Sequence, residues 1–178
     1  MDALKSYPFP NELTAAATGS RIAWAFNEQG QRNIYVAEGP DFGARRLTNY
    51  TQDDGQELSN VALSADGKWV IYVRGGDHGS NWGDELPVNP TFNPTPPKVQ
   101  IWAVPFSGGD PKALGEGEEP VISPKSDKVA FAKGGQIYTA PIDGSASALM
   151  LFSARGTNGS PVWSPDGSRL AFQSNRVD

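Results

Sequence analysis

The sequence predicts an all-β fold, a β-propeller of four-stranded antiparallel blades, of which the chain holds an incomplete ring of about three and a half. Two repeated motifs and one absence predict it. A turn followed by an alternating apolar strand occurs four times, and a second strand motif occurs three times. No stretch of useful length has the 3.6-residue period of a helix. Gly 20 and Pro 15 in 178 residues suit short strands joined by tight turns.

The first motif is a hairpin turn that ends in Gly19, Gly67, Ser126 or Gly167. In its clearest copy, Ser-Pro-Asp-Gly at 164–167, proline presets φ, the Asp side chain bonds to nearby amides and Gly supplies a positive φ. The strand after each turn alternates with period two, as a half-buried strand does. Its apolar positions are Ile22 and Trp24, Val70 and Tyr72, Val129 and Phe131, and Leu170 and Phe172.

The second motif predicts the third strand of each unit. It begins with an amide at Asn33, Gln100 or Gln136, which is followed by Ile, an aromatic residue and then small or apolar residues. Each copy leads to a turn and a short outer strand, expected at 45–47, 112–114 and 149–152. With the strand that precedes the hairpin turn, one unit has four strands in about 40 residues, which is typical of a propeller blade.

The predicted blades span 11–50, 58–115 (with an insertion at 75–98), 119–153 and 158–178. The last of these has only two strands. Because a propeller closes its ring with four to eight blades, we expect the chain to be a piece of a longer protein. Exposed strand edges also predict self-association. A β-sandwich with coincidental turns is the alternative.

Composition excludes several classes of function. Lys+Arg 15 against Asp+Glu 20 gives a net charge of −5 without a basic stripe, which argues against nucleic acid as a partner. No apolar run reaches the roughly 18–20 residues of a membrane span. The absence of Cys excludes disulfides, thiolate zinc sites and cysteine nucleophiles, and the single histidine, His78, excludes a multi-histidine metal site.

The run Trp-Ser-Pro-Asp-Gly-Ser-Arg-Leu-Ala-Phe at 163–172 resembles the TolB-type repeat, a WD40-like (PD40) propeller unit. That unit occurs in TolB, in related periplasmic proteins and in the propeller of prolyl-oligopeptidase-family (S9) serine peptidases. Segments 6–10, 44–48, 72–78 and 102–105 resemble the N-terminal propeller of a bacterial dipeptidyl or acylaminoacyl peptidase of that family.

This resemblance implies a propeller that covers a C-terminal α/β-hydrolase domain, admits peptide substrates and excludes folded proteins. The family's triad lies in the hydrolase domain, and no position here matches it. The chain has no Gly-x-Ser-x-Gly nucleophile elbow, so we expect it to be non-catalytic by itself and to bind no cofactor. The alternatives are a TolB-like periplasmic propeller that acts as a protein-binding scaffold, and a sugar-active propeller enzyme, for which no carboxylate pair can be argued.

The resemblance also implies a periplasmic or secreted location. Residues 1–6 lack the basic start and apolar stretch of a signal peptide, so a cytoplasmic location stays open.

The insertion at 75–98 is the most unusual segment, since it is long, rich in proline and charged. We predict that it contacts a substrate, a partner domain or the entrance; a surface elaboration or a flap over the neighbouring blade is the alternative. Its candidate binding residues are Asp77, His78, Trp82, Asp84 and Glu85. A catalytic role for His78 is not expected, because nothing nearby supplies an oxyanion hole.

Arg155 is a further binding candidate. It is placed to meet an anionic group in the central channel or to anchor the connection before the fourth blade. Acidic residues also gather between blades, but without the alternating Asp spacing of a calcium loop, so we expect solvated turn charges and no metal. These are Asp53, Asp54, Glu57, Glu116, Glu118 and Glu119. Recurring aromatic residues are expected to pack between blades: Trp24, Tyr35, Tyr72, Trp102, Phe131, Tyr138, Trp163 and Phe172.

Overall fold

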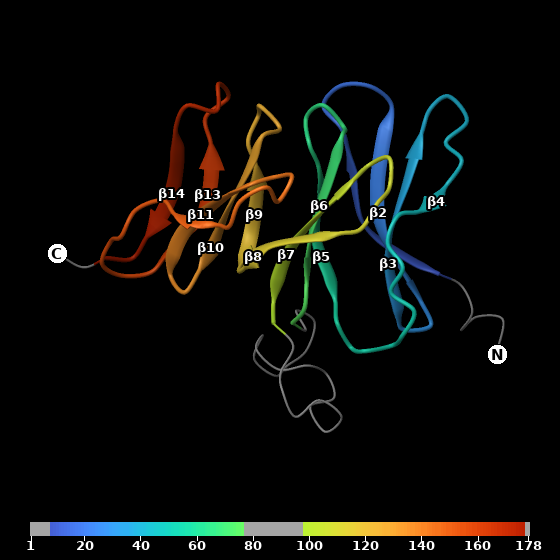
Figure 1. Cartoon of the computed structure of the whole chain (residues 1–178), viewed down its shortest axis with the longest axis horizontal. Helices are drawn as coiled ribbons and strands as arrows, with labels where there is room; N and C mark the ends of the chain where they lie inside the picture. The colour runs from blue at the N-terminus through green and yellow to red at the C-terminus, as the bar shows by residue number, and fades with distance from the viewer. Residues whose placement is uncertain (1–7, 77–97, 177–178) are drawn as a thin grey trace.

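The structure is a computed structural model that describes residues 8–76 and 98–176. These residues form antiparallel sheets that lie side by side (Figure 1). The first sheet holds β1 (Phe9–Ala15), β2 (Arg21–Glu28), β3 (Gln31–Glu38) and β4 (Arg45–Arg46). The second holds β5 (Leu58–Leu63), β6 (Trp69–Arg74), β7 (Gln100–Pro105) and β8 (Lys112–Glu116). The third holds β9 (Glu118–Ile122), β10 (Lys128–Lys133), β11 (Gln136–Pro141) and β12 (Leu149–Met150), and the fourth holds β13 (Asn158–Trp163) and β14 (Leu170–Ser174).

The fold class predicted from the sequence is confirmed. In each four-stranded sheet the spatial order of the strands follows the chain, so each sheet is an antiparallel meander like a propeller blade. No helix occurs in the described residues, and therefore none of these segments contains a helix that could span a membrane. The first and fourth sheets lie at opposite ends of the array, so the described sheets do not close a ring (Figure 1).

The hairpin turns are built as their sequence predicts. Ser64 donates its hydroxyl to Asp66 at 2.7 Å and accepts the N–H of Trp69 at 3.0 Å. Ser164 repeats the first bond with Asp166 at 2.6 Å. The last turn residue has a positive φ, 67° at Gly67 and 59° at Ser126, where a side chain replaces hydrogen. The turn is thus a hydrogen-bonded unit that fixes the register of the two strands it joins.

The amide that opens the third strand fastens the chain after the outer strand. The Asn33 amide donates to the Tyr50 carbonyl at 2.9 Å, and its oxygen accepts the Tyr50 N–H at 2.7 Å. In the third sheet the Gln136 amide makes the same two bonds with Ala154, at 3.0 and 3.1 Å. In these two sheets the contact accounts for the Asn or Gln that opens the motif, because a side-chain amide carries both a donor and an acceptor.

The core lies between the sheets and not within any one of them. One cluster joins the first and second sheets and contains Tyr72, and another joins the second and third sheets and contains Phe131. Both side chains are fully buried, as expected for aromatic residues that pack between blades. Trp163 connects the fourth sheet to the third by donating its indole N–H to the Val121 carbonyl at 3.1 Å. Phe172 is 39% exposed, so the packing is looser at this end.

Candidate functional site

The base of the insertion is the first candidate region. The insertion lies between β6 and β7. It starts at the end of the second sheet that also receives the connection from the first sheet. A Cβ on Gly75 would lie 2.8 Å from the Lys98 carbonyl oxygen, so the two ends of the insertion run side by side. The Gly75 N–H also donates to the Glu57 carbonyl at 3.1 Å. The predicted binding residues themselves lie outside the described residues: Asp77, His78, Trp82, Asp84 and Glu85.

A polar cluster holds this base against the connection between the first and second sheets. The Tyr50 and Tyr72 hydroxyls are 2.7 Å apart, and the Arg74 guanidinium lies 4.2 Å from the centre of the Tyr50 ring. Arg74 also pairs with Asp54. Burial raises the pKa of Tyr50, and burial together with the neighbouring Tyr50 raises the pKa of Tyr72 well above its ordinary value. Both phenols therefore keep their protons near neutral pH.

Arg155 lies exposed in the connection between the third and fourth sheets. The backbone on either side is held by Gln136, which donates to Ala154 at 3.0 Å and to Gly156 at 3.5 Å. Among the described residues this amide, and not the Arg155 guanidinium, makes the anchoring contact. A role for Arg155 in binding an anion stays a prediction.

Three of the acidic residues between blades, Asp53, Asp54 and Glu116, form ion pairs with neighbouring basic side chains. Asp53 lies 3.6 Å from Arg32, and Glu116 pairs with Lys98 and also lies 3.6 Å from Lys133. Lys98 holds the pKa of the Glu116 carboxyl below its usual value by a hydrogen bond and by its charge. Within residues 8–76 and 98–176, no group of three acidic or histidine side chains is arranged to hold a metal ion.

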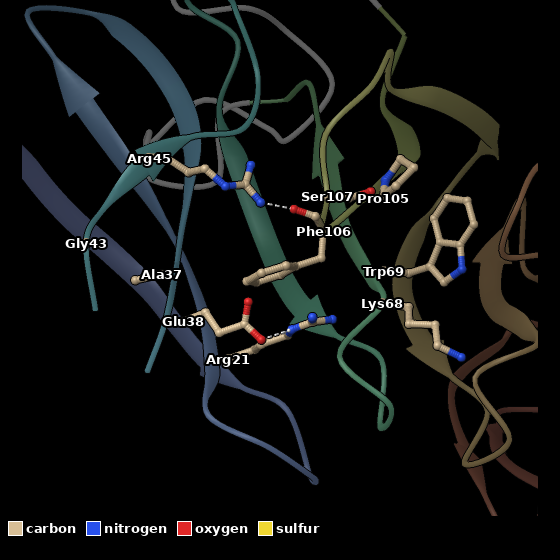
Figure 2. A pocket seen from close by; sticks show the side chains of 10 residues that line it. All are labelled: Arg21, Ala37, Glu38, Gly43, Arg45, Lys68, Trp69, Pro105, Phe106 and Ser107. Atoms are coloured by element: carbon tan, nitrogen blue, oxygen red, sulfur yellow. Dashed lines mark hydrogen bonds and ion pairs between the residues drawn. The ribbon is translucent and has the colours of Figure 1, made fainter. Parts of the chain in front are cut away.

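A cationic groove lies between the first and second sheets, at the end opposite the base of the insertion. Its volume is about 530 Å³. The Phe106 ring lies beside two guanidinium groups, Arg21 at 4.6 Å and Arg45 at 5.3 Å from the ring centre (Figure 2). The other lining residues are Ala37, Glu38, Gly43, Lys68, Trp69, Pro105 and Ser107. Sequence analysis missed this groove because its residues come from three strands of one sheet and from the β6 and β7 ends of the next.

The open face of the first sheet is the third region. We define it by Leu13, Ile22, Trp24, Phe26 and Tyr35. Trp24, Phe26 and Tyr35 form a ring cluster with centre-to-centre distances of 4.9–6.0 Å. Leu13 is 74% exposed, and a shallow apolar hollow of about 480 Å³ covers the β1–β2 part of the face. In the described structure these side chains form a contiguous apolar patch, which is unusual for the surface of a protein.

Meander sheets packed face to face in a fan define this chain as a β-propeller in fold. Solved structures bear this out. The chain is similar to a putative TolB from Agrobacterium tumefaciens (TM-score 0.56, 20% identity, 95% of this chain and 55% of that chain). It is also similar to a prolyl endopeptidase (TM-score 0.64, 12% identity, 94% and 26%) and to prolyl oligopeptidase B from Galerina marginata (TM-score 0.60, 13% identity, 94% and 26%).

These likenesses establish the fold that the resemblance in sequence implied. No protein-family model and no curated protein sequence matches the chain. The chain spans only 26% to 55% of the length of the three proteins above.

Proposed function

We propose that this chain is the non-catalytic propeller part of a prolyl-oligopeptidase-like serine peptidase, in which it controls access and positions peptide substrates. The observation that carries the proposal is the alignment of 94% of this chain with only 26% of each prolyl peptidase. Such an alignment suits a propeller segment whose chemistry is performed elsewhere in a larger protein. The absence of a nucleophile elbow from the sequence supports the same assignment.

In this proposal the insertion supplies the contact with the substrate. Its ends are fixed at Gly75 and Lys98, next to the connection between two sheets, and loops mounted on such rigid supports commonly carry binding residues. Asp77, Asp84 and Glu85 bring acidic groups that suit a peptide's amino terminus, and Trp82 brings an aromatic surface. The partner of this chain is then a C-terminal α/β-hydrolase domain of the same protein, in the periplasm or outside the cell.

A TolB-like scaffold that binds other proteins is the second candidate. The observation that favours it is the higher sequence identity, 20% to the putative TolB against 12% and 13% to the two prolyl peptidases. In this case the open face of the first sheet and the groove are binding surfaces, and no hydrolysis accompanies binding.

Labelling of the natural full-length protein with a fluorophosphonate separates the two functions. The peptidase proposal predicts that the probe labels one serine outside residues 1–178, and that short peptide amides are hydrolysed while a folded protein of similar sequence content is not. The 178-residue chain alone serves as the control and is expected to hydrolyse neither. A labelled serine within residues 1–178 would overturn the proposal. A full-length protein that is neither labelled nor active would favour the scaffold.

A further inference from the structure

The groove between the first and second sheets contains more positive charge than its own carboxylates neutralise. Arg21 pairs with Glu38 at 2.9 Å, and Lys68 pairs with Asp66 at 3.2 Å. Arg45 has no carboxylate within ion-pair distance in the described structure; it donates one N–H to the Phe106 carbonyl. The chain as a whole carries a net charge of −5, so this excess of positive charge is local to the groove.

The equivalent contact between the second and third sheets shows which part of this arrangement the fold itself requires. Lys112 begins β8 as Arg45 begins β4, and it donates to the Asp143 carbonyl at 2.9 Å. A cation that bonds to the backbone of the next sheet is thus a repeated structural contact. The arginine and the aromatic ring are not repeated: Trp69 and Ile142 stand where the groove has Arg21 and Phe106. The two guanidiniums beside one ring are therefore particular to the groove.

Both guanidiniums keep donors for a ligand. A guanidinium has five N–H groups. Arg21 uses two, one to Glu38 and one to the Gly67 carbonyl at 3.1 Å, and Arg45 uses one. Their remaining N–H groups have no acceptor among the described residues. Figure 2 shows the two side chains approaching Phe106 from different strands, whereas the Trp69 ring lies away from Phe106 and packs against the core between the second and third sheets.

We propose that this groove binds a carboxylate carried on an aromatic or aliphatic group. Arginine N–H groups in a planar fork match the two oxygens of a carboxylate. The Phe106 ring, which lies beside both guanidiniums, supplies an apolar surface for the rest of the ligand. The volume of about 530 Å³ lies in the range of small-ligand sites, roughly 300–1,000 Å³. The inference depends on the groove alone and holds for either proposed function.

Calorimetric titration of the 178-residue chain tests the site with two carboxylates, 3-phenylpropanoate and acetyl-Gly-Phe with a free carboxyl group. Acetyl-Gly-Phe amide is the matched uncharged ligand. We expect both carboxylates to bind, the amide to bind at least about tenfold more weakly, and added salt to weaken binding of the acids. Tighter binding of the peptide acid would identify a peptide C-terminus as the ligand, whereas equal or tighter binding of 3-phenylpropanoate would identify a small free acid.

Two variants with the same loss of charge complete the test. Arg45→Gln is expected to weaken binding of the acids by about tenfold or more, because a charge-assisted hydrogen bond is lost. Arg46→Gln is the control, since the Arg46 side chain bonds to Asn49 at 2.6 Å and does not line the groove. Thermal unfolding of both variants verifies that they are folded. Equal affinity for the acid and the amide, or equal effects of the two substitutions, would overturn the proposal.

Discussion

The two faces of the first sheet are made from the same strands but have different surroundings. The face against the second sheet carries Ala23, Ala25, Ile34 and Val36, which are all buried. The open face carries the larger side chains of Ile22, Trp24 and Tyr35 from neighbouring positions, and these are only half-buried. The smaller side chains are therefore the ones that the described sheets cover.

The second sheet shows what the open face of the first lacks. Val70 and Tyr72 are buried against the first sheet, and Ile71 and Val73 are buried against the third. Trp24 occupies in the first sheet the position of Tyr72 in the second. A sheet that is apolar on both faces is typical of one buried on both sides. We infer that the open face of the first sheet is built to pack against another sheet.

The largest effect is expected from a substitution in the core, compared with one on the open face. Phe131→Ala should lower the free energy of unfolding by about 3–5 kcal/mol, because it empties a fully buried site between the second and third sheets. Trp24→Ala should cost much less in a dilute sample, since that ring is partly exposed. Urea denaturation measures both values. Equal losses would mean that the open face is part of the core of the isolated chain.

A second comparison concerns two glycines with positive φ. A Cβ on Gly117 (φ 147°) would lie 2.4 Å from the Ala132 carbonyl oxygen, whereas a Cβ on Gly19 (φ 87°) would meet no atom within 4 Å. Gly19→Ala should therefore lower the free energy of unfolding only by the backbone strain, about 1–3 kcal/mol. Gly117→Ala should cost distinctly more in urea denaturation, because the backbone must shift as well. A smaller loss for Gly117→Ala would contradict the contact between β9's start and β10.

The hairpin turns predict a dependence of stability on pH. Burial raises the pKa of Asp66, but hydrogen bonds from Ser64 and Lys68 more than offset this and lower it below 3.8. The Ser123 hydroxyl likewise holds the pKa of Asp127 below its usual value. Because the folded-state values are lowered, this stabilisation is fully present above about pH 3.8 and is lost as the pH falls through the folded values.

Chemical denaturation at a series of pH values below 5 measures this effect. Asp66→Asn should make the free energy of unfolding depend less steeply on pH, because the contribution of one carboxylate is removed. An unchanged slope in that variant would show that the Asp66 turn does not contribute.

The smallest expected effect is a gain. Ser126 has a φ of 59°, at the position where the other three hairpin turns have Gly19, Gly67 and Gly167. Ser126→Gly should raise the free energy of unfolding by less than about 1 kcal/mol, since relief of the left-handed strain is partly offset by the greater freedom of the unfolded chain. Gly167→Ser is the reciprocal control and should lower it. Thermal unfolding detects both, and a loss in Ser126→Gly would mean that its bond to the Asp66 N–H, 3.3 Å, matters more.

Much of the fold was predictable because each strand and turn is specified locally. Ser64 and Asp66 bond within their own turn, and Asn33 reaches a residue of the same blade, so repetition along the chain reveals them. The groove was not predictable, because Arg45 and Phe106 meet only when two sheets pack together. The role of the insertion stays a prediction, since its candidate residues lie outside the described residues.

Sedimentation velocity over a range of concentrations tests the inferred role of the open face most directly. We expect the 178-residue chain to self-associate through this face and Leu13→Asp, at a position 74% exposed on it, to shift the chain to monomer. Leu149→Asp is the control, because Leu149 is 71% exposed on β12, which belongs to the third sheet. A chain that stays monomeric at high concentration, or equal association of both variants, would contradict the account.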